Sequence, residues 1–200
     1  MENKIKKILN GMDCTDRMTI GMIYDAFKEE GIKVHYSSGA TKGCFIFQNF
    51  VIKFKLDDSD SRHYDDCVER ELQIYNLAKG RGLEKILLPT EFFFTNFYGM
   101  EFIKQQKITC ITDYERPKKR NANRMRDKNI DHKEVYKVRK SFYRGCCLNS
   151  DWTRRAIHIY GKNFLKEFEK FTHEYKINDL HCANVGYLGR RPVILDFSGY

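Results

Sequence analysis

The fold is decided by the stretch Ile177-Asn-Asp-Leu-His-Cys-Ala-Asn-Val-Gly-Tyr187, which is followed closely by Pro192-Val-Ile-Leu-Asp-Phe-Ser-Gly199. Two short apolar runs flank the turn residues Leu188-Gly-Arg-Arg191. This pattern predicts a hairpin with strands at residues 184–187 and 193–197.

Three polar residues stand at informative places around this hairpin. Asp179 lies on the preceding loop, five residues before Asn184, and Asp196 lies at the end of the second strand, twelve residues further on. Taken singly, such residues are typical of solvated turns. Together they offer oxygen ligands for Mg²⁺ and a carboxylate for an attacking hydroxyl, which are the groups that phosphoryl transfer needs.

Upstream of the hairpin, the apolar patterns predict the order β-β-β-α-β-β, preceded by an amphipathic helix from about Thr19 that Gly31 ends. One long helix is expected from about Ser150 to Glu174. The other expected elements are strands at residues 32–36, 44–47, 50–56, 90–97 and 99–104 and a helix at 64–79.

The positive charge of the chain is concentrated in one segment. Residues 116–144 contain 12 basic and 3 acidic residues, which accounts for the whole formal net charge of +9. The segment reads as a long loop or a partly ordered helix, most often a solvated surface. Its Lys and Arg side chains could also neutralise nucleic-acid phosphates, with Tyr136, Phe142 and Tyr143 stacking on bases, or dock an acidic protein.

Composition excludes a disordered tail and a small disulfide-stabilised protein. Hydrophobic residues make up 42% of the 200 residues, enough for one substantial core or two small lobes. The seven cysteines show no C-x-x-C pair, so free thiols in a reducing compartment are expected. Residues 1–10 mix charged with apolar residues, unlike a signal peptide, and no run approaches the length of a membrane span. A cytoplasmic protein without a membrane partner is therefore predicted.

The decisive stretch also resembles a known family. Asp179-Leu-His-Cys-Ala-Asn184 with Asp196-Phe-Ser-Gly199 is similar to the catalytic loop and metal-binding motif of the protein-kinase-like superfamily. The Asp-x-x-x-x-Asn spacing is similar to that of eukaryotic-type kinases, while Asp-Leu-His resembles more the aminoglycoside and choline phosphotransferases, and similar short versions occur in compact kinase-like proteins of bacteriophages. The resemblance implies that Asp179 is the catalytic base and that Asn184 and Asp196 hold Mg²⁺.

A lysine and a glutamate complete the expected catalytic set. Phe50-Val-Ile-Lys53 resembles the Val-Ala-Ile-Lys motif, which would place Lys53 on the ATP phosphates. Lys55 shares its face of the strand, but the flanking valine and isoleucine favour Lys53. Glu71 lies on the apolar stripe of the following helix, so a buried partner such as Lys53 is expected, and Glu69 is the alternative.

Two further stretches resemble nucleotide-binding parts of kinases. Ser37-Ser-Gly-Ala-Thr-Lys-Gly43 occupies the place of the glycine-rich loop, with Gly39 and Gly43 allowing close approach of a phosphate. Met100-Glu-Phe-Ile103, placed at the close of the fifth strand, resembles the hinge that receives adenine through Met100 and Phe102. Ordinary turn and edge-strand packing are the alternatives.

The resemblance covers residues 32–200 and implies an α+β, two-lobe, kinase-like fold with a truncated, mainly helical C-lobe. The activation segment and later helices have no counterpart before Tyr200. The expected organisation is a helical extension at 1–31, an N-lobe at 32–106, a basic insert at 107–149 and a minimal C-lobe at 150–200.

The function this implies is transfer of the ATP γ-phosphate to a hydroxyl, with ATP and Mg²⁺ as cofactors. The acceptor is either a protein Ser/Thr or a small molecule, and the setting could be a phage-infected bacterium. The alternative is a catalytically inactive, kinase-shaped module that binds a protein or nucleic acid through the basic insert.

Overall fold

The computed structural model describes residues 1–11, 13, 17–39, 41–56, 66–108, 110–111, 129–143 and 148–198. The chain divides into two compact units. The first comprises Met1–Gln73 and Pro89–Lys107, and the second comprises Ile74–Leu88 and Ile108–Tyr200. No helix within the described ranges is long and apolar enough to cross a membrane.

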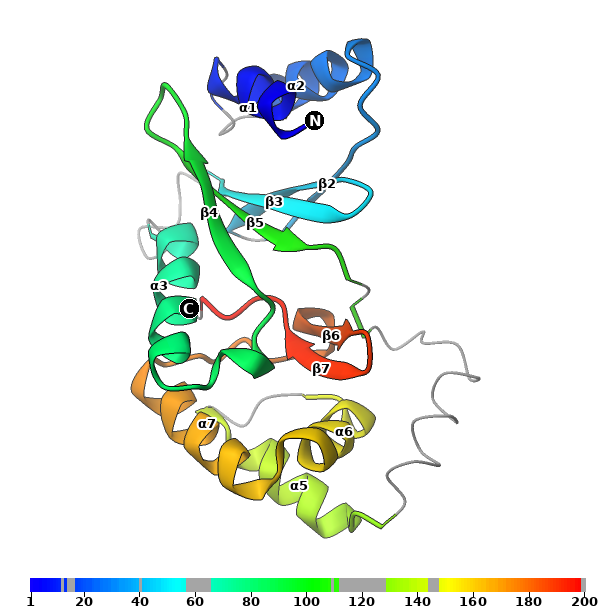
Figure 1. Ribbon diagram of the computed structural model, residues 1–200, viewed down its shortest axis with the longest axis vertical. Coiled ribbons are helices and arrows are strands. Elements are labelled where there is room, and N and C mark those ends of the chain that lie inside the picture. Colours follow the sequence, from blue (N-terminus) through cyan, green and yellow to red (C-terminus); the bar gives the residue numbers. More distant parts are fainter. Residues whose placement is uncertain are drawn as a thin grey trace. The chain divides into compact units, whose positions relative to one another are not determined.

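The first unit is built on a five-stranded sheet (Figure 1). Every neighbouring pair is antiparallel, in the order β1-β2-β3-β5-β4. The strands are β1 (His35–Ser38), β2 (Lys42–Ile46), β3 (Phe50–Lys55), β4 (Thr90–Thr95) and β5 (Glu101–Gln106). Helix α3 (Cys67–Gly80) falls between β3 and β4, so the predicted α+β class and the β-β-β-α-β-β order are confirmed.

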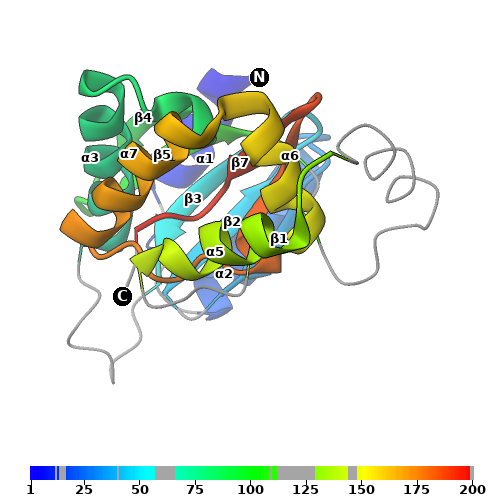
Figure 2. The ribbon, with the colours of Figure 1, turned by 90° about the horizontal axis from the view of Figure 1, so that it is seen from below.

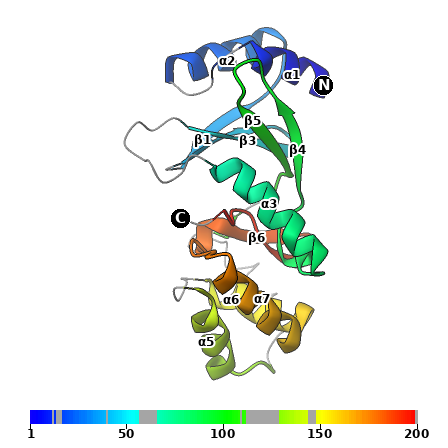
Figure 3. The same cartoon turned by 90° about the vertical axis from the view of Figure 1, so that its left-hand side faces the viewer.

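One face of this sheet is apolar and is covered by two N-terminal helices, α1 (Glu2–Asn10) and α2 (Arg17–Glu29) (Figure 3). Side chains of a strand alternate between the two faces, so Ile52 and Phe54 point together into this core. Phe27 of α2 packs edge-on against Phe45 of β2, with ring centroids 5.5 Å apart. The helix expected from Thr19 is thus confirmed, and it ends before Gly31, whose φ is +68°.

The opposite face of the sheet carries the side chains that alternate with those of the apolar face, such as Lys53 between Ile52 and Phe54. Lys53 pairs with Ile103 across β3 and β5, and Ile103 packs against Val68 and Leu72 in the first two turns of α3. This face is therefore partly apolar. It also collects polar side chains, because the register that buries Ile52 and Phe54 on one face places Lys53 on the other.

The second unit combines helices with a short hairpin, and Figure 2 views its helices from below. Its core contains Trp152, Phe168 and Phe171. Trp152 donates from Nε1 to the carbonyl of Gly186, 3.1 Å away. The elements are η1 (Glu84–Ile86), α5 (His132–Ser141), α6 (Ser150–Tyr160), α7 (Lys162–Glu174), η3 (Cys182–Asn184), β6 (Val185–Leu188) and β7 (Arg191–Ile194).

Two side-chain contacts connect distant parts of this unit. The Tyr160 hydroxyl donates to the carbonyls of Lys85 and Pro192, and burial raises the pKa of Tyr160 above its ordinary value. Arg81 forms a two-pronged ion pair with Glu174 at 2.6 and 2.7 Å, which lowers the pKa of that carboxyl. The Tyr160 contacts hold the segment around η1 against α6 and β7.

The single helix expected from Ser150 to Glu174 is wrong, because the chain forms α6 and α7 on either side of Gly161. Gly161 has φ +78° and ψ 162°, a conformation that L side chains rarely adopt and that no α-helix contains. Its N–H still donates to the carbonyl of Ile157, so it caps the first helix. The apolar stripe continues across the break, which is why the pattern alone resembled one helix.

Gly43 provides a test of the packing in the first unit. A Cβ at Gly43 would lie 2.4 Å from Cζ of Phe54, whose buried ring stacks on Phe45 and has no room to move. We expect Gly43→Ala to lower the free energy of unfolding by about 1–3 kcal/mol through overpacking. Urea denaturation measures this, with Gly39→Ala as the control, since a Cβ there meets nothing within 4 Å. Equal stability of the two variants would contradict this packing.

Candidate functional site

The first unit holds a buried ionic cluster centred on Glu71, whose side chain is completely inaccessible to solvent. Lys53 Nζ donates to Oε1 of Glu71 and Lys42 Nζ donates to Oε2, each at 2.6 Å. The predicted pairing of Glu71 with Lys53 is therefore confirmed. Each oxygen of the Glu71 carboxyl accepts a hydrogen bond from a lysine, which replaces the water lost on burial.

A buried amide completes this cluster. Gln105 of β5 donates from Nε2 to Glu71 Oε1 and to Thr90 Oγ1 of β4, both at 2.8 Å. Both hydrogens of this amide therefore have acceptors. Donors from β2, β3 and β5 thus converge on one carboxylate of α3, which fixes the position of each lysine.

The alternatives to Lys53 and Glu71 lie elsewhere. Lys55 is more exposed than Lys53, and Glu69 lies on the exposed side of α3. Partial desolvation raises the pKa of Glu69, the neighbouring carboxylates of Glu101 and Asp66 add to this rise, and Lys55 opposes it. Glu69 and Lys55 thus influence each other at the surface, while Glu71 and Lys53 form the buried pair.

The second unit holds the candidate catalytic loop. Asn184 donates from Nδ2 to both the backbone carbonyl of Asp179, at 2.8 Å, and Oδ2 of its carboxylate, at 2.9 Å. The loop is closed by backbone bonds from His181 N to Asp179 O and from Asn184 N to His181 O. Asp179 is therefore held in one orientation, and its carboxylate stays partly exposed.

His181 contacts the same carboxylate from the other side. Its Nδ1 accepts a hydrogen bond from the N–H of Ala183 at 3.1 Å, so in the neutral ring the proton belongs on Nε2. Nε2 lies 3.4 Å from Oδ1 of Asp179. Each carboxylate oxygen of Asp179 thus faces a donor, and His181 orients Asp179 rather than standing alone in the loop.

The hairpin places the backbones of the two expected metal ligands, Asn184 and Asp196, near each other. Val185 of β6 pairs with Ile194 of β7, and the N–H of Leu195 donates to the carbonyl of Asn184 at 2.8 Å. Asp196 therefore directly follows Leu195, the residue that is hydrogen-bonded to Asn184. Phe197 is buried in the core of the second unit, which anchors the backbone beside Asp196, and Ser198 Oγ donates to the Asp196 carboxylate at 3.3 Å.

This pair of residues suits Mg²⁺ chemically. One carboxylate and one amide oxygen are hard ligands, and Mg²⁺ usually completes its octahedron with phosphate oxygens and water. Across the described ranges, no three His, Cys, Asp or Glu side chains gather in a way that could hold a metal ion. Asn184 and Asp196 could thus bind Mg²⁺ that arrives with a polyphosphate rather than build a cage of their own.

The expected glycine-rich loop is shorter than predicted. β1 ends at Ser38 and β2 begins at Lys42, so only three residues of the sequence separate the two strands. Gly39 directly follows β1, and its N–H donates to the carbonyl of Lys42. Gly43, by contrast, lies inside β2 opposite Phe54, so the placement of Gly43 in a phosphate-binding loop is wrong. Its lack of a side chain makes room for the Phe54 ring.

The expected hinge is also misplaced. Met100 directly precedes β5 and Phe102 is its second residue, so neither lies at the end of the strand, because the chain turns at Asn96–Gly99. The Asn96 side chain accepts from the N–H groups of Tyr98 and Met100 and so stabilises that turn. Phe102 is completely buried and stacks on Phe94, so its side chain cannot receive adenine.

The basic insert is described only in part, since residues 109, 112–128 and 144–147 lie outside the described ranges. Within it, α5 is capped by Asp131. Phe142 is buried against Phe168, so the expectation that it stacks on bases is wrong. Tyr136 is 60% exposed, and Tyr143 packs edge-on against His173.

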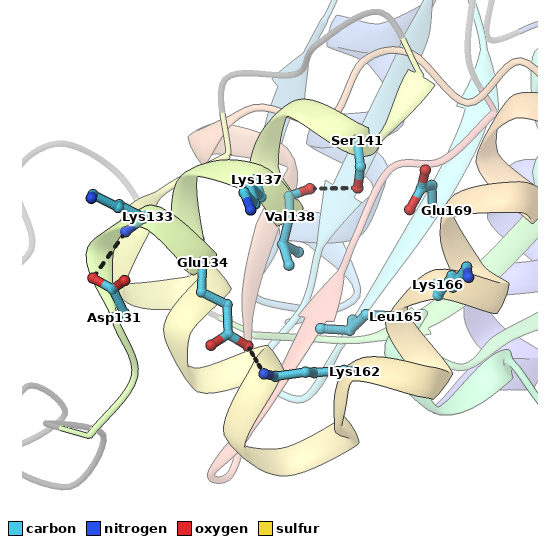
Figure 4. A pocket seen from close by; sticks show the side chains of 10 residues that line it. All are labelled: Asp131, Lys133, Glu134, Lys137, Val138, Ser141, Lys162, Leu165, Lys166 and Glu169. Atoms are coloured by element: carbon cyan, nitrogen blue, oxygen red, sulfur yellow. Dashed lines mark hydrogen bonds and ion pairs between the residues drawn. The ribbon is translucent and has the colours of Figure 1, made fainter.

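An open groove lies between α5 and α7 (Figure 4). No residue of the Asp179 loop lines it. Lys162 and Glu134 form an ion pair of 3.0 Å across it. Its lining mixes both charges and includes none of the predicted site residues. The lining residues are Asp131, Lys133, Glu134, Lys137, Val138, Ser141, Lys162, Leu165, Lys166 and Glu169.

In comparisons with known proteins, no family model, curated protein or solved structure matches the chain. The structure groups the predicted residues into two sets. Lys53 and Glu71 meet in the first unit, and Asp179, Asn184 and Asp196 lie around one hairpin of the second. Sequence reasoning missed Lys42, Gln105 and Thr90. The signal that could have found them is the alternation of each strand, once its register is known.

Glu71 provides the test of the cluster. Replacing Glu71 by Ala removes the carboxylate that both buried lysines contact, so we expect the free energy of unfolding to fall by about 3–5 kcal/mol. Glu69→Ala on the exposed side of the same helix is the control and should change it by less than about 0.5 kcal/mol. Urea unfolding of both variants decides the point, and a Glu71→Ala protein as stable as the control would show that the carboxylate is not needed.

Proposed function

We propose that this chain is an ATP-dependent phosphotransferase of the protein-kinase-like type, which transfers the γ-phosphate to a hydroxyl. The observation that carries the proposal is the buried Lys53–Glu71 ion pair, which joins the third strand to the helix after it. This arrangement is the one that the resemblance to kinases implied for the lysine that orients ATP.

The arrangement of the second unit supports the same chemistry. Asp179 is oriented by Asn184 and His181, and it is the carboxylate that would align the acceptor hydroxyl and take its proton. Asn184 and Asp196 would hold Mg²⁺ on the phosphates, where the ion neutralises developing charge. Lys53 would contact the phosphates, with Glu71 holding its ammonium group in place.

The architecture of the first unit is compatible with the N-lobe of this fold. A five-strand antiparallel sheet with one helix inserted after the third strand is the element order that the resemblance implied. The acceptor is proposed to be a protein Ser/Thr side chain, with a small-molecule hydroxyl as the alternative that His181 favours.

The first test is ligand-induced stabilisation. A ligand that binds only the native state, present at 100 times its Kd, stabilises it by about 2.7 kcal/mol. We expect MgATP to raise the Tm of the wild-type protein by about 5–10 °C. ATP with a chelator should give a smaller shift, and Asp196→Ala should remove the metal-dependent part.

Glu167→Ala is the control for this experiment, because Glu167 is an exposed carboxylate of the same unit that forms an ion pair with Lys170 within α7. It should keep the full shift. A wild-type protein whose Tm does not respond to millimolar MgATP would refute the proposed function.

Asp179 is tested separately from binding. Asp179→Asn keeps a side chain of nearly the same shape but cannot accept the proton of the acceptor hydroxyl. We expect the MgATP shift to remain and phosphate transfer to fall by at least 100-fold, the usual scale of general-base catalysis. Transfer is measured with γ-labelled ATP as autophosphorylation and as hydrolysis to inorganic phosphate. Unchanged turnover would remove Asp179 from the reaction.

A second candidate function is a kinase-shaped module that binds an acidic protein or a nucleic acid. The observation that favours it is the basic surface of α5, where Tyr136 is exposed beside Lys140. The burial of Phe142 removes one of its three expected stacking residues. Steep loss of affinity between low and moderate salt would identify nucleic-acid binding of this kind.

A further inference from the structure

Lys42 is placed to act with Lys53, although the kinase resemblance gave it no role and assigned only Gly39 and Gly43 within the stretch 37–43. Lys42 is the first residue of β2. Lys42 pairs with Lys55, and Cys44 pairs with Lys53, in the ladder between β2 and β3. Because side chains alternate along a strand, Lys42 and Lys53 leave the same face of the sheet.

Glu71 brings the two ammonium groups close together. Lys42 takes one carboxylate oxygen and Lys53 takes the other, both at 2.6 Å. Since these oxygens belong to one carboxyl group, both ammonium groups lie directly beside the same carboxylate. The side chains of Lys42 and Lys53 are only 5% and 8% exposed, so both are held in place by the surrounding protein.

The charge and the donor geometry of this pair suit a polyphosphate. Each ammonium group is a compact positive charge that carries three N–H donors. An ammonium group binds phosphate as a point charge, and two of them at fixed positions can contact neighbouring phosphates of one chain.

We propose that Lys42 is a second phosphate-binding residue, which together with Lys53 holds the polyphosphate of a nucleoside triphosphate. The identity of the nucleotide rests on the proposed function, whereas the contact with phosphate rests on the cluster itself. Glu71 is then the positioning residue for both lysines. A purely structural Lys42 would affect the stability of the protein but not the affinity of the folded protein for phosphate.

The experiment measures the affinity of the full chain for MgATP and for inorganic tripolyphosphate by isothermal titration calorimetry. Lys42→Met and Lys53→Met remove the charge and keep most of the apolar stem, and Lys55→Met is the control on the same face of the sheet. We expect each of the first two variants to weaken both ligands by at least 10-fold, and Lys55→Met to change them less than 2-fold. Circular dichroism confirms folding, and Lys42→Gln replaces Lys42→Met if the latter does not fold.

The double variant adds a second readout. Lys42 and Lys53 share Glu71 and, on this proposal, one ligand, so their losses in affinity should not multiply as those of independent sites do. MgATP binding that is unchanged in Lys42→Met or Lys42→Gln but lost in Lys53→Met would overturn the proposal and leave the phosphotransferase function intact. Tripolyphosphate binding that depends on Lys42, without any binding of MgATP, would support the phosphate site and overturn the function. A wild-type protein that binds neither probe would overturn both.

Discussion

Burial of the Glu71 carboxylate is the constraint on which the first unit depends. An ionised carboxylate removed from water costs several kcal/mol unless charged and polar donors replace the water. Here the donors come from three strands, through Lys42, Lys53 and Gln105. Gln105 also reaches Thr90 on the fourth strand. A slip of one residue in any of these strands would turn its donor to the apolar face covered by α1 and α2, so this one carboxylate helps to fix the register of the sheet.

The parts of this cluster that sequence reasoning predicted are those that depend on local periodicity. Glu71 lies on an apolar helical stripe of period 3.6, and Lys53 is flanked in its strand by apolar residues. The sequence close to each residue therefore predicts that the residue is buried. The sequence around Lys42 and Gln105 does not. Lys42 stands at the first position of a strand, in a polar stretch that resembles a loop, and Gln105 stands near the end of another strand. Their burial depends on strand pairing: Lys42 pairs with Lys55, and Gln105 pairs with Thr90. Neither pair is close in sequence, so no local pattern shows it.

The same distinction explains the errors elsewhere. Residues 150–174 carry one continuous apolar stripe, and only the positive φ of Gly161 separates α6 from α7. Met100 and Phe102 belong to a long aromatic run whose turn is set by the Asn96 side chain, so the run alone does not show where one strand ends and the next begins. The order of elements and the hairpin at the C-terminal end were predictable, because glycines and short apolar runs mark them directly. Exact strand ends depend on hydrogen bonds that no local pattern contains.

The Glu71 cluster is poorly explained as a device for stability alone. Apolar side chains of similar volume often stabilise a protein as well as a buried ion pair does, because they avoid the cost of desolvating charge. What the ionic cluster provides, and apolar packing cannot, is two ammonium groups whose positions are set before any ligand arrives. Preorganised charge of this kind binds an anion without reorganising at the moment of binding. The loop at Asp179 follows the same logic, because Asn184 and His181 already orient its carboxylate. In both units the protein fixes a charged group through hydrogen bonds, which is the property expected of groups that act on a ligand.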